Sequence, residues 1–147
     1  MPNQQNITAS EVYDLARDWF HGVTTGESGS TIARLFRYPD ARIYAPNGQA
    51  FTLEEHRVLH SKWISDRHVL GDFQLISISD DPPRIRATGT VYWEARYIEP
   101  LSSGPNLIKA VAGEDWMIER LPDEKLCFVL YCTRFFHLLP ESAPVLL

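Results

Sequence analysis

Imidazoles and carboxylates are the groups in this sequence that could bind a metal ion or transfer protons. His56 and His60 are four residues apart, so both rings would lie on one face of a helix, a spacing that suits two ligands of a zinc ion. A third ligand is not evident from the spacing of the remaining candidates. Pairs of this kind more often belong to a solvated helix face, so we predict no metal site and no cofactor.

Aromatic side chains from several predicted elements could line a pocket for a small apolar or aromatic molecule. Such rings serve in core packing as well as in ligand cages, and we expect a pocket with a packed inner end and an open mouth. The aromatic residues expected to converge there are Trp19, Tyr44, Trp63, Trp116, Tyr131 and Phe135.

The composition limits the class of protein and its partners. The chain has 147 residues, of which 44% are hydrophobic and 22% are charged. We therefore expect a single domain over residues 1–147, with its core at about 8–138 and a tail at 139–147 that is either ordered against a partner or loose. A formal net charge of -5 argues against binding to nucleic acid. No signal-peptide pattern or membrane-spanning apolar run is present, which predicts a cytoplasmic protein without a membrane partner.

The first third of the chain has the pattern of helices. Thr8 and Glu11 have the spacing of a capping box, and apolar residues follow at helical intervals as far as Val23. A short helix is expected around residues 32–36 and a short strand over 41–45. Thr52 and Glu55 repeat the capping-box spacing and predict a third helix that ends near residue 65.

The remainder of the chain has the pattern of long strands. Residues 69–79, 84–98, 107–121 and 126–138 are rich in β-branched and aromatic residues and are separated by turn-forming segments. Helices followed by long strands predict an α+β fold, in which three N-terminal helices pack on a curved antiparallel sheet around an internal pocket. Because apolar residues occur on both faces of this sheet, we expect a homodimer or homotrimer that is formed through the outer face.

This order of elements resembles the nuclear transport factor two-like superfamily, also called the cystatin-like cone fold, over roughly residues 8–138. The local likeness lies in the phrase YPDARIYAPNG, which begins at Tyr38, and in the turn DEKL, which begins at Asp123. The superfamily includes isomerases, polyketide cyclases, dehydratases and non-catalytic members, so the resemblance alone assigns no activity. The positions that carry the tyrosine, the aspartate base and the second acid of ketosteroid isomerases hold Trp19, Ala45 and Trp116. Isomerase activity is therefore not expected.

The similarity to scytalone dehydratase implies an acid–base pair. The catalytic histidine that follows the third helix in that family falls on His68, and its second histidine falls on Glu94. A dehydratase needs a base next to the substrate carbonyl and an acid for the leaving hydroxyl, inside a pocket that excludes water. His68 and Glu94 could supply both, and Asp115, or its neighbour Glu114, could supply a second acid from the adjacent strand.

The direction in which residues 84–98 face decides whether Glu94 can act. If the even-numbered residues face inward, Tyr92 and Glu94 line the pocket, whereas Glu94 is a surface charge if they face solvent, as polar residues usually do. His68 could equally be a structural histidine at a helix end. Asp115 could instead lie in a bulge at the edge of the sheet.

Two functions are compatible with these residues. The first is a cofactor-free lyase of the dehydratase or cyclase kind, which acts on an aromatic or polycyclic hydroxy-ketone. The second is a non-catalytic module that uses the same pocket for ligand binding, or the outer sheet face for assembly. A catalytic histidine near a carboxylate should impose an ionisation between about pH 5 and 8 on ligand binding, and an apolar pocket should not.

Overall fold

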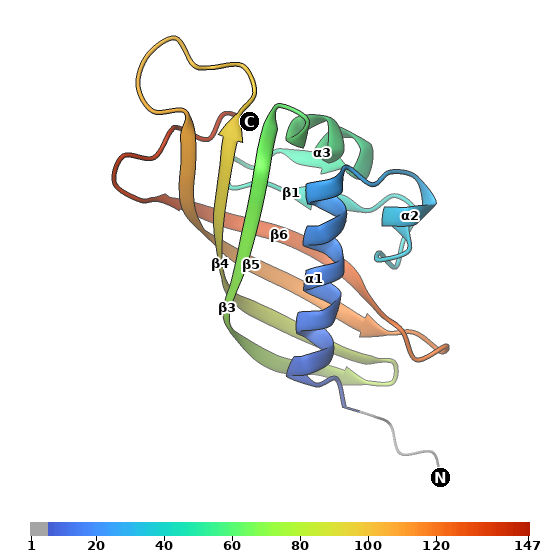
Figure 1. The fold of residues 1–147 in the computed structure, drawn as a ribbon. Coiled ribbons are helices and arrows are strands. Elements are labelled where there is room, and N and C mark those ends of the chain that lie inside the picture. Colours follow the sequence, from blue (N-terminus) through green and yellow to red (C-terminus); the bar gives the residue numbers. More distant parts are fainter. Residues whose placement is uncertain (1–5) are drawn as a thin grey trace.

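The protein is described here by a computed structural model that covers residues 6–147. Within this range, helices come first and long strands follow, as the sequence predicts (Figure 1). The helices are α1 (Ala9–Thr25), α2 (Ser30–Ala33) and α3 (Leu53–His60). The strands are β1 (Arg42–Tyr44), β2 (Ala50–Thr52), β3 (Trp63–Asp80), β4 (Pro83–Tyr97), β5 (Leu107–Arg120) and β6 (Leu126–Leu138).

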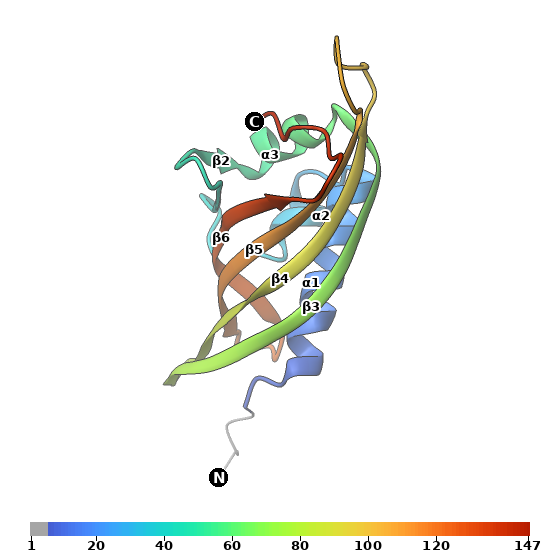
Figure 2. The ribbon, with the colours of Figure 1, turned by 90° about the vertical axis from the view of Figure 1, so that its left-hand side faces the viewer.

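The strands of residues 6–147 form one six-stranded sheet in the order β2-β1-β6-β5-β4-β3. Neighbouring strands are antiparallel except for β1 and β6, which run parallel. The long strands bend strongly along their length, and α1 lies against one face of the curved sheet, with α3 at one end (Figures 1 and 2). The predicted α+β fold, with N-terminal helices on a curved sheet, is confirmed.

Helix α1 is held by its cap and by a buried stripe. The hydroxyl of Thr8 accepts a hydrogen bond from the Glu11 backbone N–H, and the Glu11 side chain accepts one from the Thr8 backbone, which completes the predicted capping box. Val12, Ala16 and Trp19 then face the sheet and are almost fully buried. They pack in one apolar cluster with residues of β1, β4, β5 and β6, so α1 closes the concave face of the sheet.

Helix α3 is shorter than the sequence suggests, and it lies at the edge of the core. It begins after Thr52 with the second predicted capping box, but it ends at His60 rather than near residue 65, and β3 begins at Trp63 rather than at residue 69. No residue of α3 is fully buried. Its eight residues cover one end of the sheet, where Leu53 and Leu59 are partly buried and pack against the core.

The burial of its side chains shows which face of β4 points into the core. Ala87, Val91 and Trp93 are buried, whereas Tyr92 and Glu94 lie on the opposite, outer face. The hypothesis that the even-numbered residues of this strand line the pocket is therefore wrong. The physical reason is the greater gain from burying the apolar side chains of the odd-numbered positions.

The segment after β6 packs against the chain's own sheet. Ala143 is fully buried, and its backbone N–H bonds to the carbonyl of Leu107 at 2.8 Å. The Tyr97 hydroxyl donates to the Pro144 carbonyl at 2.8 Å and accepts from the Leu146 N–H at 3.0 Å. The segment runs towards α3 (Figure 2).

None of the helices in residues 6–147 is long and apolar enough to cross a membrane.

Candidate functional site

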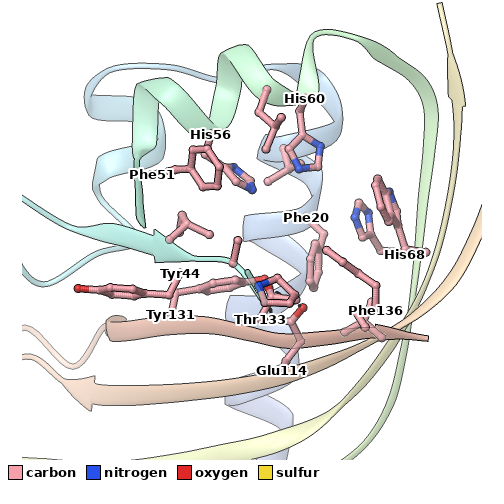
Figure 3. A pocket seen from close by; sticks show the side chains of 18 of the residues that line it. Phe20, Tyr44, Phe51, His56, His60, His68, Glu114, Tyr131, Thr133 and Phe136 are labelled. Atoms are coloured by element: carbon pink, nitrogen blue, oxygen red, sulfur yellow. Dashed lines mark hydrogen bonds between the residues drawn. The ribbon is translucent and has the colours of Figure 1, made fainter. Parts of the chain in front are cut away.

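A cavity lies between α1, α3 and the concave face of the sheet (Figure 3). Its volume is about 70 Å³, several times the roughly 10–15 Å³ that one water molecule needs. Most of its walls are apolar or aromatic, and its polar groups are few. The side chains that could do chemistry there are His56, His60, His68, Glu114, Tyr131 and Thr133.

Glu114 is a buried carboxyl at the sheet side of the cavity. It is 5% exposed. The Trp116 indole N–H donates to one carboxyl oxygen at 3.0 Å, and the Thr133 hydroxyl lies 3.2 Å from both oxygens. Burial raises the pKa of Glu114 to about 8, against the opposing effect of these hydrogen bonds. At neutral pH this group is therefore mainly a neutral acid, which can donate a hydrogen bond to a ligand.

His68 lies on β3 on the other side of the cavity. Its ring stacks on Phe20 of α1, with centroids 4.3 Å apart and planes inclined by 20°. Burial lowers the pKa of His68 to about 4, even though the charge of Asp66 acts in the opposite direction. Among residues 6–147 no group hydrogen-bonds to this imidazole. At neutral pH its ring is neutral and offers a nitrogen lone pair.

Two further histidines enter the cavity from α3. His56 stacks with Trp19 at a centroid distance of 5.3 Å and lies 4.4 Å from the ring of His60. Burial, together with the nearby His60 and His68, lowers the pKa of His56 well below its usual value. The Nδ1 of His60 lies 3.5 Å from Asp66. Within the part of the chain that the structure describes, no three histidine, cysteine or acidic side chains are arranged to hold a metal ion.

The structure brings some of the predicted site residues together. His68 lines the cavity, as do four of the predicted aromatic residues, Trp19, Tyr44, Trp63 and Tyr131. Trp116 lies in the adjacent core, where it is fully buried and supports Glu114. Their expected roles in binding stay predictions.

Four predicted site residues lie on the outer face, so the prediction that they line the cavity is wrong. They are Tyr92, Glu94, Asp115 and Phe135. Glu94 accepts from Tyr92 at 2.7 Å and pairs with Arg67 at 3.3 Å. Asp115 accepts two hydrogen bonds from Arg86, at 2.9 and 2.7 Å, and faces away from the cavity. Phe135, the fourth, is 47% exposed. Of the two neighbouring acids on β5, it is Glu114 that enters the cavity.

A β-bulge explains the position of Phe135. On β6 the pairing with β5 passes from Phe135 opposite Gly113 to Thr133 opposite Glu114, so Arg134 is an extra residue. The alternation slips by one at this point, and Phe136, not Phe135, turns into the cavity. The ring of Phe135 instead covers Gly113, where an added Cβ would lie 2.0 Å from it. A glycine within a strand often marks a bulge or a close approach of this kind, and Gly113 was the one feature of the sequence that pointed to this bulge.

Comparisons with known proteins inform the fold. No model of a protein family matches the sequence. No curated protein matches it either. Solved structures do match, and eight of them have TM-scores of 0.61 to 0.66.

Three of these structures show what kinds of protein share the fold and how similar they are to this chain. A nuclear transport factor two-like protein from Cytophaga hutchinsonii has a TM-score of 0.61 and 13% identity, over 86% of this chain and 98% of that chain. The hexachlorocyclohexane dehydrochlorinase LinA-type3 from Novosphingobium barchaimii has a TM-score of 0.65 and 19% identity, over 92% and 93%. A protein of unknown function with a cystatin-like fold from Nostoc punctiforme has a TM-score of 0.63 and 17% identity, over 97% and 100%.

These identities are too low to transfer an activity, but the shared architecture extends over most of each chain. This chain has the cystatin-like cone fold of the nuclear transport factor two-like proteins.

Proposed function

We propose that this chain is a lyase that uses its own side chains to catalyse an elimination on a small, largely apolar hydroxy-ketone. His68 is the general base and Glu114 is the general acid of the proposed site. The observation that carries the proposal is the presence of both groups on one mainly apolar cavity. Their surroundings move the two pKa values apart, down to about 4 for His68 and up to about 8 for Glu114. A neutral base and a neutral acid thus coexist at pH 7.

The proposed reaction begins at the carbonyl group. His68 removes the proton from the carbon next to the carbonyl, and Glu114 transfers its proton to the carbonyl oxygen, so the electron pair of the C–H bond forms the double bond of an enol and Glu114 becomes a carboxylate. The enol O–H then returns its proton to Glu114 as the carbonyl re-forms, and the electrons of the enol double bond form the new carbon–carbon double bond as the C–O bond to the hydroxyl breaks. The imidazolium returns its proton to the departing hydroxyl, and water leaves. Apolar walls favour both steps because they keep solvent from the developing charge.

The cavity favours a compact substrate. Its volume of about 70 Å³ suits a small ligand, so a polycyclic hydroxy-ketone would require α3 or the segment after β6 to move. Leu147 of that segment lines the cavity together with α3. The name of the dehydrochlorinase describes an elimination by that protein, and it supports this reaction class for the present chain only by analogy of fold.

The test uses the aldol adduct of benzaldehyde and acetone, a one-ring β-hydroxy-ketone whose dehydration gives a conjugated, ultraviolet-absorbing enone. We expect the protein to accelerate this reaction and Glu114→Gln and His68→Phe each to lower kcat/KM by about 100-fold, the lower end for general acid–base catalysis. Glu94→Gln is the matched control, because it makes the same change on the outer face. Turnover that survives both cavity substitutions would rule out this pair as the catalytic groups.

A non-catalytic binding protein is the second candidate. The observation that favours it is the setting of His68, whose ring is stacked on Phe20 and is only weakly basic, with a pKa of about 4. A base of such low pKa accepts a proton from carbon less readily than one matched to neutral pH. Binding of the same adduct, measured by the fluorescence of the cavity residues Trp19, Trp63 and Trp93, without any turnover would favour this function.

A further inference from the structure

Asp66 is a buried carboxylate next to the cavity that the proposed reaction does not use. The pairing of β3 with β4 is shifted between Ile64 and Arg67, and Ser65 has a φ of 58°. This irregularity advances the alternation by one residue, so Arg67 faces the outer side and Asp66 turns inward. The Asp66 side chain is only 5% exposed.

Two side-chain nitrogen atoms converge on this carboxylate. The Trp93 indole N–H donates to Oδ1 at 2.8 Å, and Nδ1 of His60 lies 3.5 Å from Oδ2, at the long end of hydrogen-bond distances. Burial acts to raise the pKa of Asp66, but the contact with His60 and the other hydrogen bond outweigh it and lower the pKa. An ionised carboxylate only accepts hydrogen bonds, so the proton of a neutral His60 belongs on Nδ1.

The other ring nitrogen of His60 remains available. His60 lines the cavity from α3 and its side chain is 14% exposed (Figure 3). Aromatic rings surround it, with centroids at 4.4 Å for His56 and 4.9 Å for Trp63. Among residues 6–147 no group donates a hydrogen bond to Nε2 of His60. A lone pair without a hydrogen-bond donor in these largely aromatic surroundings favours a ligand that brings a donor.

We propose that Asp66 is a positioning residue that fixes His60 as the Nδ1–H tautomer, and that Nε2 of His60 accepts a hydrogen bond from a hydroxyl group of the ligand. This inference rests on the proposed function and narrows its substrate class. Glu114 donates to an acceptor at the sheet side of the cavity, and His60 accepts from a donor at the α3 side. The ligand class is therefore an uncharged compound that carries a carbonyl and a separate hydroxyl group.

The role of Asp66 is tested in the ligand-free protein by the ¹⁵N NMR spectrum of its labelled histidines at neutral pH, with His60→Gln to assign the signals. We expect Nδ1 of His60 to carry the proton. In Asp66→Asn the amide oxygen keeps the bond from Trp93, so the NH₂ group replaces Oδ2 and faces Nδ1. The proton should then move to Nε2. The control Asp72→Asn, on an exposed position of β3, should change nothing.

The spectrum decides this step without any ligand. An Nε2–H tautomer in the unmodified protein, or a tautomer that Asp66→Asn leaves unchanged, would overturn the positioning role. Because the measurement needs no turnover, it also separates this inference from the proposed lyase activity.

Recognition of the hydroxyl is tested by the dissociation constants of acetophenone and the three positional isomers of hydroxyacetophenone, followed by tryptophan fluorescence. We expect one isomer to bind roughly threefold to tenfold more tightly than acetophenone, the range of one net hydrogen bond. Asp66→Asn, a change outside the cavity lining, should remove this advantage and leave acetophenone itself unaffected. His60→Phe should also remove the advantage, and Glu114→Leu, which removes the hydrogen-bond donor, should weaken the binding of all four compounds. An advantage that is absent, or that survives Asp66→Asn, would contradict hydroxyl recognition by His60. Binding of all four compounds that is unchanged in Glu114→Leu would instead count against the proposed function.

Discussion

At the level of single residues, the surroundings of Glu114 and His68 matter more than their chemical type. Both are ordinary titratable groups, yet burial moves the pKa of the acid upward and that of the base downward. Asp115 follows Glu114 directly in the sequence, but it lies on the outer face, where Arg86 lowers its pKa. One step along a strand therefore separates a neutral acid from an ionised one.

Glu114→Gln should remove a pH dependence from the stability of the fold. Because the pKa of Glu114 rises from 4.5 to about 8 on folding, the folded chain keeps a proton that the unfolded chain has lost. The free energy of unfolding should therefore fall as the pH rises, by up to about 2 kcal/mol between pH 6.5 and 8. The lowered pKa of His68 has the opposite effect, and only below pH 6.5, where stability is lost as the pH falls towards about 4.

Urea unfolding of the unmodified protein and of Glu114→Gln at pH 6.5 and 8 measures this difference. Other groups titrate in both proteins and cancel in the comparison. If both proteins lost the same stability, Glu114 would already be ionised at pH 6.5, and it could not serve as the proposed acid.

The sequence located part of the site because some signals are local. His68 was found through the similarity to scytalone dehydratase, and the inward aromatic residues were found because the predicted elements that carry them should converge on the interior of the fold. Glu94 and Phe135 were misplaced for different reasons. Glu94 was misplaced because the apolar residues of β4, and not its polar ones, are buried, whereas Phe135 was misplaced because the extra residue Arg134 reverses the alternation on β6. Such a bulge has no reliable signature in one sequence.

At the level of elements, α1 and α3 begin with the same type of cap but differ in how deeply their residues are buried. Each helix begins with a complete capping box, at Thr8 and at Thr52. The sequence therefore predicted both starts. The end of α3 was predicted wrongly, near residue 65 instead of at His60, since nothing local marks it and β3 pairs with β4 already from Trp63 onwards. Helix α1 packs in the core, whereas α3 has no fully buried residue, so the two helices should respond differently when the cap is lost.

Thr52→Ala should loosen α3 alone, because the loss of a cap costs about 1 kcal/mol and the helix has little packing to replace it. We expect faster hydrogen exchange of the α3 amides, with little change in the free energy of global unfolding. The matched change Thr8→Ala should lower the global stability by about 1 kcal/mol instead, since α1 is part of the core. Equal effects of the two substitutions on global unfolding would show that α3 unfolds together with the core.

At the level of the whole molecule, the sheet has one covered and one open face. The concave face carries α1 and the cavity, and the outer face combines apolar side chains with ion pairs. Phe135 and Leu130 on β6 are 47% and 42% exposed, and Val69 on β3 is 44% exposed. Asp115 lies among them and pairs with Arg86 and Arg134. An exposed face of this kind is typical of surfaces that bind another protein chain.

We expect this outer face to join copies of the chain into a homodimer or homotrimer, as the apolar pattern on both faces of the strands suggests. Phe135→Asp would place an unpaired charge in such an interface and should reduce the mass found by sedimentation equilibrium to that of one chain. Val58→Asp is the control, because Val58 is 54% exposed on α3, away from the sheet. Circular dichroism would verify that both variants fold. A monomeric mass for the unmodified protein at tens of micromolar, or an unchanged oligomer in Phe135→Asp, would mean that this face does not mediate assembly, and the apolar residues there would need another partner.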